Sequence, residues 1–207
     1  MTPRIAVIGA SRGIGLATVN EALARGHAVT GLARTPPALS KPGLKWIKGD
    51  VRDSASLAQA LDGATVVVTA LAAGGLGPTT LFSDSAKAVS AAMANAGAKR
   101  LIAITGFGAG DSRGHAGFMM DRIVQPLLLG RMYADKDREE AFVRTTRLAW
   151  TIVRPGRLTN GPKSGRVKAM TGDFRPGSIS RDDVASFVLD CIEKDEYLRQ
   201  SPVIVAG

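Results

Sequence analysis

The amino-acid sequence predicts an α/β fold in which about seven strands form one doubly wound parallel sheet with helices on both faces. Short apolar runs alternate with helical patterns from the start of the chain to residue 104. The run Val66–Val67–Val68 is unbroken, which is typical of a parallel strand buried on both faces. A length of 207 residues suits one domain, so we expect a single domain over residues 1–207.

The first half of the chain carries the clearest elements. Residues 4–9 read as a buried strand, and the helical pattern of residues 13–25 ends at Gly26. Asp53 is expected to cap a second helix, and Gly97 to end a third. The remaining elements of this half are strands at 27–32, 44–48, 65–69 and 100–104, and helices at 53–61 and 80–96.

The second half is less regular. Residues 106–117 hold five glycines and predict a flexible loop, and residues 155–178 predict an irregular surface segment. Ser180 is expected to cap a helix that runs to about residue 194, with Asp183 in its first turn. The other predicted elements are a charged helix at 135–147 and strands at 149–153 and 202–205.

Composition limits the class of protein. With 45% hydrophobic and 22% charged residues, the chain has ordinary globular usage, which excludes long disorder. Cys191 is the only cysteine, so no intramolecular disulfide can form, and with two histidines no zinc site of the usual type is expected. The N-terminus does not read as a secretory signal, and the apolar run 66–77 is too short to cross a membrane. We therefore expect a soluble, cytoplasmic protein with no membrane partner.

The net charge of +9 and the pI of about 10.2 favour anionic ligands. No block of five or more Lys and Arg residues occurs, and aromatic residues make up only 5% of the chain. Such a chain offers little for stacking on bases, so no specific nucleic-acid partner is predicted.

The sharpest motif follows the first predicted strand and opens the first helix. It is the segment Gly9-Ala10-Ser11-Arg12-Gly13-Ile14-Gly15, with the spacing G-x-x-x-G-x-G. Glycines let the backbone turn tightly, approach a pyrophosphate and pack the helix on the sheet, while the helix N-terminus offers free N–H groups to phosphates. In this context the motif predicts a Rossmann-type dinucleotide site.

The end of the second strand indicates which dinucleotide binds. A site for NAD usually places an acidic residue there, to accept from the ribose 2′-hydroxyl. This chain has Arg34 instead, which suits a 2′-phosphate, and Arg12 and Ser11 can reach the same group. The sequence therefore favours NADP(H) over NAD, with Arg34 as a plain surface residue the alternative.

These residues resemble the short-chain dehydrogenase/reductase superfamily, and within it the atypical NAD(P)H-binding branch that includes NmrA-like proteins and biliverdin reductase B, a flavin reductase. The resemblance extends over nearly the whole chain. Besides the glycine segment it rests on 49–53, 69–71, 151–156 and 179–185.

The resemblance implies a role for several residues outside the glycine segment. Asp50 would contact the adenine amino group, with Val51 beside it, although Asp50 could instead cap the following helix. Ala70 and Leu71 would line the adenosine ribose. Residues placed by the resemblance near the nicotinamide are Thr105, Lys136, Pro155 and Gly156.

The chain departs from the family at the catalytic pair. The family pattern is Tyr-x-x-x-Lys, in which the lysine lowers the tyrosine pKa so that the tyrosine exchanges a proton with a carbonyl. Lys136 matches the lysine, but Met132 stands at the tyrosine position, and Tyr133 lies three residues before Lys136. Tyr133 is thus either a rotated proton donor or a packing residue, and the alcohol-dehydrogenase mechanism is in doubt.

A conjugated acceptor would not need that tyrosine. Apolar candidates for a wall around such a ring are Phe107, Phe118, Met119, Met120 and Met132, with core packing as the alternative. His115 is a candidate proton donor or an exposed loop residue, and Cys191 is expected to be inert in the core.

The sequence leaves three functions open. The first is an NADPH-dependent reductase of a small conjugated acceptor such as a flavin or quinone. The second is a non-catalytic NADP-binding regulator of NmrA-like type, and the third is a nucleotide-sugar-type epimerase or dehydratase. The ligand is expected where strand order reverses at the C-terminal edge of the sheet, under loops at 72–79, 106–120 and 156–178. The protein is expected to be a monomer or a homodimer.

Overall fold

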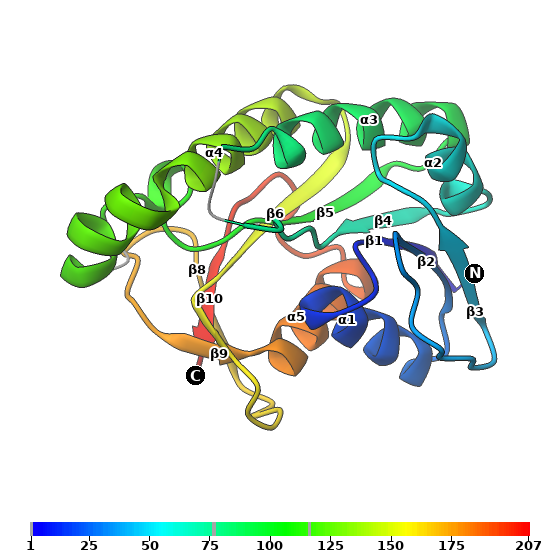
Figure 1. Ribbon diagram of the computed structural model, residues 1–207. Helices are drawn as coiled ribbons and strands as arrows, with labels where there is room; N and C mark the ends of the chain where they lie inside the picture. The colour runs from blue at the N-terminus through cyan, green and yellow to red at the C-terminus, as the bar shows by residue number, and fades with distance from the viewer. Residues whose placement is uncertain (1, 76–77, 116) are drawn as a thin grey trace.

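A computed structural model describes residues 2–75, 78–115 and 117–207 of the chain (Figure 1). Its main sheet has eight strands in the order β3-β2-β1-β4-β5-β6-β10-β8. All neighbouring strands are parallel except β10 and β8. The predicted α/β fold is confirmed, with one strand more than the sequence indicated.

The elements follow the predicted order through the first half of the chain. The strands of the main sheet are β1 (Arg4–Ile8), β2 (Ala28–Ala33), β3 (Leu44–Lys48), β4 (Val66–Thr69), β5 (Arg100–Ile104), β6 (Ala149–Pro155), β8 (Val167–Met170) and β10 (Val203–Ala206). The helices are α1 (Gly13–Ala24), α2 (Ser54–Leu61), α3 (Leu81–Ala96), α4 (Gly130–Thr145) and α5 (Arg181–Glu193), with a 3₁₀ turn η1 (Gly110–Ser112) and a π-helical segment η2 (Met120–Leu129).

Three predicted helix caps are present. Asp53 accepts from the Ser56 backbone N–H at 2.9 Å, and Gly97 ends α3 in the left-handed conformation with φ 74°. Ser180 accepts from the Asp183 backbone N–H at 3.0 Å. Each cap satisfies backbone groups that the helix itself leaves without a partner, so the local sequence fixes these three helix ends.

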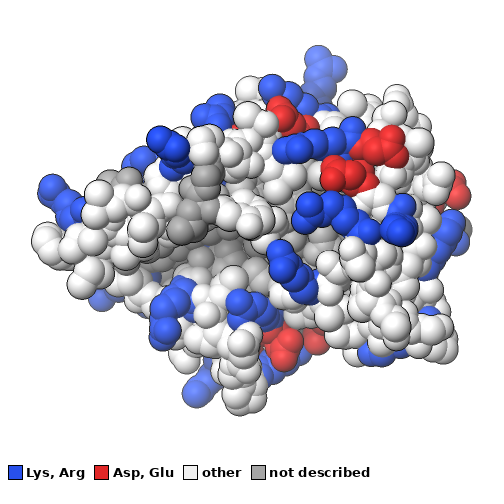
Figure 2. Space-filling view, viewed as in Figure 1, with Lys and Arg blue, Asp and Glu red and all other residues white. Residues whose placement is uncertain are grey.

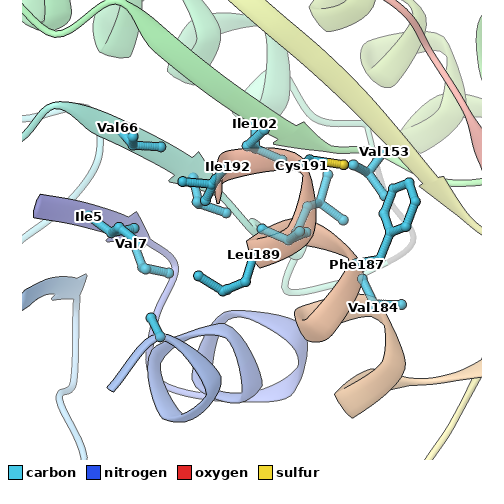
Figure 3. Packing of buried hydrophobic residues seen from close by; sticks show 14 of the residues in the cluster. Ile5, Val7, Val66, Ile102, Val153, Val184, Phe187, Leu189, Cys191 and Ile192 are labelled. Carbon is cyan, nitrogen blue, oxygen red and sulfur yellow. The ribbon is translucent and has the colours of Figure 1, made fainter. Parts of the chain in front are cut away.

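Helices cover the sheet on both faces, with α1 and α5 on one side and α2, α3 and α4 on the other (Figure 1). Successive residues of β4 divide between the two cores: Val66 and Val68 pack with α1 and α5, whereas Val67 packs with α2 and α3. Figure 3 shows the first core, in which Leu189 and Ile192 of α5 lie against the sheet. The unbroken valine run is therefore buried on both faces, as the sequence predicts.

The charged helix predicted at 135–147 begins earlier than expected. Here α4 starts at Gly130 and continues directly from η2, because Gly130 has right-handed helical angles (φ −55°, ψ −42°). Together η2 and α4 form the long helical segment that extends beyond the sheet at the left of Figure 1. Gly130 does not end the helix, because a helix-ending glycine usually has a left-handed conformation and Gly130 has a right-handed one.

The expectation of an irregular segment at 155–178 is wrong in part. β7 (Arg157–Thr159) pairs with β9 (Ser178–Ser180) in a small second sheet, and β8 joins the main sheet beside β10. These strands are three or four residues long and lie between glycines and prolines. Such short runs carry no periodic signal, so only pairing with distant strands makes them strands.

The strand order reverses between β1 and β4. The helices that follow these two strands lie on opposite faces, which leaves a crevice at the carboxyl ends of the strands. Within the described residues, no helix is both long enough and apolar enough to cross a membrane.

Candidate functional site

A cavity of about 920 Å³ opens at the point where the strand order reverses. Its walls come from the segments that follow β1, β2, β3, β4 and β5, so it lies at the carboxyl edge of the parallel sheet. Figure 2 shows a hollow near the middle of this face, with Lys and Arg side chains beside it. The position is the one at which open α/β sheets bind ligands.

The glycines of the first loop let backbone approach backbone. A Cβ added to Gly9 would lie 2.5 Å from the Ala70 carbonyl oxygen, and Gly9 has φ +86°. A Cβ on Gly15 would lie 2.2 Å from the Gly9 carbonyl oxygen. Both distances are too short for any side chain, so these two glycines bring the loop against β4 and helix α1 against the loop.

The N-terminus of α1 is open to an anion. Its N-cap residue, Arg12, makes no side-chain cap hydrogen bond, and the first turn carries no acidic residue. The first N–H groups of a helix then lack intrahelical partners, and the helix dipole is positive at this end. This uncapped end, framed by glycines at 9, 13 and 15, fits the pyrophosphate of a dinucleotide.

Five of the seven residues of the glycine segment line the cavity, namely Gly9, Ser11, Arg12, Gly13 and Ile14. Ala10 and Gly15 are buried behind the lining. These two residues serve the close packing of the loop rather than contact with a ligand.

Four arginines line this cavity: Arg12 and Arg34, which the sequence singled out, and Arg52 and Arg181, which it did not. Arg181 donates to the Thr159 carbonyl oxygen at 3.0 Å and lies beside Gly13. Their joint positive charge suits a ligand with several phosphates. Arg52 follows Asp50 by two residues and Arg181 begins α5, so only the fold brings these two arginines to the same cavity.

The structure excludes a helix cap as the role of Asp50. Asp53, not Asp50, caps α2, whereas Asp50 accepts from the Arg52 backbone N–H at 2.9 Å and lines the cavity. Val51, Ala70 and Leu71 line it as well. Asp50 is therefore a lining residue of the cavity and not a helix cap.

A second cavity of about 830 Å³ adjoins the first. The two share the lining residues Ile14, Leu71, Ala72, Ala73, Thr105 and Leu158. Predicted residues that line the second cavity are Thr105, Phe107, Met132, Tyr133, Lys136, Pro155 and Gly156. The tertiary structure thus brings the three candidate catalytic residues, Thr105, Tyr133 and Lys136, to one wall.

Hydrogen bonds to the protein occupy the candidate catalytic groups. The Tyr133 hydroxyl donates to the Phe107 carbonyl oxygen at 3.0 Å, and the Thr105 hydroxyl donates to Glu140 Oε1 at 2.8 Å. Burial raises the pKa of Tyr133, and the carboxylates of Asp121 and Asp137 raise it further. Tyr133 is thus held as a neutral phenol whose proton points at the backbone.

Lys136, like Tyr133, contacts the backbone of the segment that follows β5. Its ammonium group donates to the Thr105 carbonyl oxygen at 2.9 Å and lies 4.2 Å from the centre of the Phe82 ring. Burial lowers the pKa of Lys136, while Glu139, Glu140 and Asp135 oppose that effect. An ammonium has three N–H donors, so Lys136 retains donors for a ligand in the cavity.

A buried ion pair between Arg154 and Glu140 lies behind the Thr105 side chain in the wall of the second cavity. Arg154 Nε lies 3.0 Å from Glu140 Oε1, and Arg154 Nη2 lies 2.5 Å from Glu140 Oε2. Both side chains are almost fully buried. Although burial opposes it, the contact with Glu140 raises the pKa of Arg154. The ion pair fixes the position of Glu140, which accepts the hydrogen bond from the Thr105 hydroxyl. No pattern in the sequence indicated this ion pair, because Arg154 and Glu140 lie on different elements.

Of the other candidates for the apolar wall and the proton donor, some line the second cavity and others do not. Phe107 and Met132 line the second cavity, but Phe118 and Met119 are 78% and 63% exposed and form no wall. The side chain of Met120 lies outside the described part of the chain. His115 is exposed, lines neither cavity and lies edge-on to the Phe174 ring.

Cys191 is fully buried in the core between the sheet and α5 (Figure 3). Burial raises the pKa of its thiol to about 12. A thiol that stays protonated is a poor nucleophile, so the expectation of an inert core residue is confirmed. Within the described residues, no group of three or more His, Cys, Asp or Glu side chains could hold a metal ion.

The fold and the first cavity define a dinucleotide-binding protein of the doubly wound class. The sequence profile of the NAD(P)H-binding family matches residues 9–195. The chain therefore belongs to the NAD(P)H-binding family.

Two curated relatives share part of the chain. The Bacillus subtilis (strain 168) protein called "Uncharacterized sugar epimerase YhfK" is 34% identical over 152 residues, which are 72% of this chain and 64% of YhfK. An Arabidopsis thaliana chloroplastic protein, At2g34460, is 33% identical over 96 residues, which are 44% of this chain. The matched residues span 64% and 34% of the lengths of these relatives.

Solved structures resemble the fold over its full length. ChuY, described as an anaerobillin reductase from Escherichia coli O157:H7, has a TM-score of 0.84 and 22% identity, covering 100% of this chain and 98% of ChuY. A short-chain dehydrogenase/reductase from Veillonella parvula DSM 2008, solved in complex with NADP, has a TM-score of 0.83 and 17% identity, covering 100% and 96% of the two chains. At these identities the likeness concerns the fold.

Proposed function

We propose that this protein is an NADPH-dependent reductase that transfers a hydride to a small conjugated acceptor, such as a flavin or a quinone. The observation that carries the proposal is the pair of adjoining cavities. The first has the shape and charge for a dinucleotide, and the second is lined mainly by apolar side chains and backbone.

The first cavity provides groups for each part of the cofactor. The N-terminus of α1 would bind the pyrophosphate, and Arg34 with Arg12 would bind a 2′-phosphate through charged hydrogen bonds. Asp50 would accept from the adenine amino group. Because no acidic residue follows β2 directly, the arginines favour NADPH over NADH.

The second cavity would hold the acceptor. Phe107 and Met132 provide flat or adaptable apolar surface for a ring, and the Lys136 ammonium can donate to a ligand oxygen. The reduced nicotinamide, when bound, supplies the hydride. The contribution of the protein is then to orient two flat groups and to exclude water between them.

The engaged state of Tyr133 and Thr105 favours this class of acceptor. A simple ketone or a sugar needs a protein group that gives or takes a proton. Tyr133 donates to Phe107, and the Thr105 proton goes to Glu140. A quinone or flavin delocalises the charge it gains and can take its proton from solvent, so it does not depend on either hydroxyl.

The engaged hydroxyls of Tyr133 and Thr105 also support a second candidate function, a non-catalytic NADP-binding regulator. A protein that only senses the cofactor needs the first cavity but no proton donor in the second. The nucleotide-sugar epimerase or dehydratase suggested by the name of YhfK is less favoured, because that chemistry relies on an ionised tyrosine. A measurement of NADPH turnover distinguishes these alternatives, whereas a measurement of cofactor binding does not.

The test is steady-state oxidation of NADPH with menadione, FMN and riboflavin as acceptors. The reductase predicts acceptor-dependent oxidation that saturates with NADPH, and a higher kcat/KM with NADPH than with NADH. Tight NADP binding without turnover of any acceptor would contradict the reductase and favour the regulator. Absence of binding by calorimetry for all four pyridine nucleotides would contradict both.

A further inference from the structure

We propose that the second cavity takes acceptors that carry an anionic group beside the conjugated ring, and that Arg157 and Ser178 bind that group. The expectation of a conjugated ring rests on the reductase function proposed above. The expectation of an anionic group rests on the residues at the rim of the cavity. It adds a chemical class to the acceptor, namely conjugated compounds with a phosphate, sulfonate or carboxylate.

The charges that line the second cavity have one sign. Its charged lining residues are Lys136 and Arg157, and none of its described lining residues is an aspartate or glutamate. The charge of Lys136 is balanced by the buried carboxylates of Asp135 and Glu140 on its own helix. Arg157 is exposed, and no carboxylate or hydrogen-bond acceptor among the described residues engages its guanidinium.

A hydroxyl group lies next to that guanidinium. Ser178 is the direct register partner of Arg157 in the parallel pair β7–β9, and both residues line the cavity. Side chains of register partners in neighbouring strands lie on the same face of a sheet. The Ser178 hydroxyl also has no hydrogen-bond partner within the described residues. A guanidinium and a hydroxyl side by side offer several donors to one oxyanion.

The backbone holds these two donors in place. The Arg157 backbone N–H donates to the Gly177 carbonyl oxygen at 2.9 Å. A Cβ on Gly156 would lie 2.4 Å from that same oxygen, and a Cβ on Gly177 would lie 2.8 Å from Val205 Cβ. Both strands are therefore packed closely against β10. Arg157 stands on a fixed strand rather than on a loose loop, which reduces the entropy lost when it binds an anion.

FMN and riboflavin form a matched pair of probes, since they share the ring and differ by a phosphate. Flavin fluorescence titrations of the NADP⁺-saturated protein measure binding without turnover. We expect FMN to bind about tenfold more tightly than riboflavin, in line with a charged hydrogen-bonded contact. Arg157→Gln should remove that preference and leave riboflavin binding unchanged, and Ser178→Ala should reduce it a few-fold.

Arg147→Gln is the matched control. Arg147 is exposed, lines neither cavity, and its replacement lowers the net charge by the same amount. It should leave the preference for FMN intact at all salt concentrations. Thermal unfolding of each variant checks that it is folded.

Three results would overturn the proposal: a wild-type protein without preference for FMN, an Arg157→Gln variant that keeps the preference, or an equal loss in Arg147→Gln. If neither flavin binds, a naphthoquinone and its sulfonated analogue replace them, with binding measured by isothermal titration calorimetry, and absence of binding by this pair also overturns the proposal. Retained preference without NADPH oxidation would contradict the reductase function but support the anion site.

Discussion

The buried charges of α4 predict that the protein loses stability as pH rises through the neutral range. Three carboxylates, Asp135, Glu139 and Glu140, and two cations, Lys136 and Arg154, have exposures of 0%, 3%, 2%, 6% and 0%. The partly exposed Arg138 and Arg144 add ion pairs to Asp135 and Glu140, whereas Lys136 is the one described cation that lowers the pKa of Glu139. Asp135 and Glu140 each accept several hydrogen bonds, whereas Glu139 Oε2 has no partner within the described residues. Glu139 is then the group that stays protonated.

The pKa of Glu139 sets the size and the sign of the effect. Burial raises this pKa from 4.5 to about 8, although Lys136 opposes the shift. In the unfolded chain the carboxyl group ionises near 4.5, so between these two pH values the folded state holds a proton that the unfolded state has released. The stabilisation is complete below pH 4.5 and is lost as pH rises to about 8. At about 1.4 kcal/mol per pH unit, the loss has an upper bound of about 5 kcal/mol.

The assay is urea unfolding of the wild type and of Glu139→Gln at about pH 5 and about pH 8.5. Glutamine has the shape of the protonated side chain and cannot ionise. We expect the free energy of unfolding of the wild type to fall by several kcal/mol more than that of the variant across this interval. At the higher pH the variant should be the more stable protein.

Glu140→Gln is the control on the neighbouring residue. Glutamine at position 140 leaves the buried Arg154 with the largely exposed Asp111 as its remaining charged partner, so we expect a loss of about 3 kcal/mol at both pH values. The reasoning on Glu139 would be refuted by equal pH dependence in the wild type and in Glu139→Gln. It would also be refuted if glutamine at position 139 destabilised the protein as strongly at high pH as at low pH.

The remaining predictions concern the site. Arg34→Glu should weaken NADPH binding by about 2 kcal/mol or more while NADH changes little, and calorimetry that gives equal losses would contradict the 2′-phosphate assignment. Gly9→Ala should lower the stability by about 3 kcal/mol or more in thermal unfolding and abolish NADPH binding, because its Cβ meets backbone. Gly26→Ala, at φ +83° with open space around it, isolates the backbone strain and should cost about 1 kcal/mol. Tyr133→Phe should lose about 1 kcal/mol of stability with the bond to Phe107 and retain quinone turnover within about threefold; a loss of about a hundredfold would make Tyr133 the proton donor.

Much of the fold could be predicted because its signals are local. The strand before Gly9, the helix after Gly13 and the caps Asp53 and Ser180 depend on residues within one turn of each other. The same holds for the glycine loop of the first cavity, since this kind of loop is one continuous segment between a strand and a helix. The sequence also indicated Arg34, because the end of the second strand lies at a regular distance from the glycine loop.

Other features required the assembled fold. The strand β8 forms only by pairing with β10, and Arg157 and Ser178 become neighbours only through the pairing of β7 with β9. The hydrogen bond from the Tyr133 hydroxyl to the Phe107 carbonyl oxygen also joins residues that are far apart in the sequence. No local pattern reports such a contact.

By itself, the sequence determined that this chain forms a doubly wound sheet with a glycine-rich loop between its first strand and first helix, since hydrophobic periodicity and glycine spacing act over a few residues. Only the tertiary structure decided which charges are buried together, which hydroxyl protons are engaged, and that Arg157 stands at the rim of a second cavity. Those properties depend on contacts between distant parts of the chain, whose partners are fixed by packing and strand pairing rather than by the residues on either side.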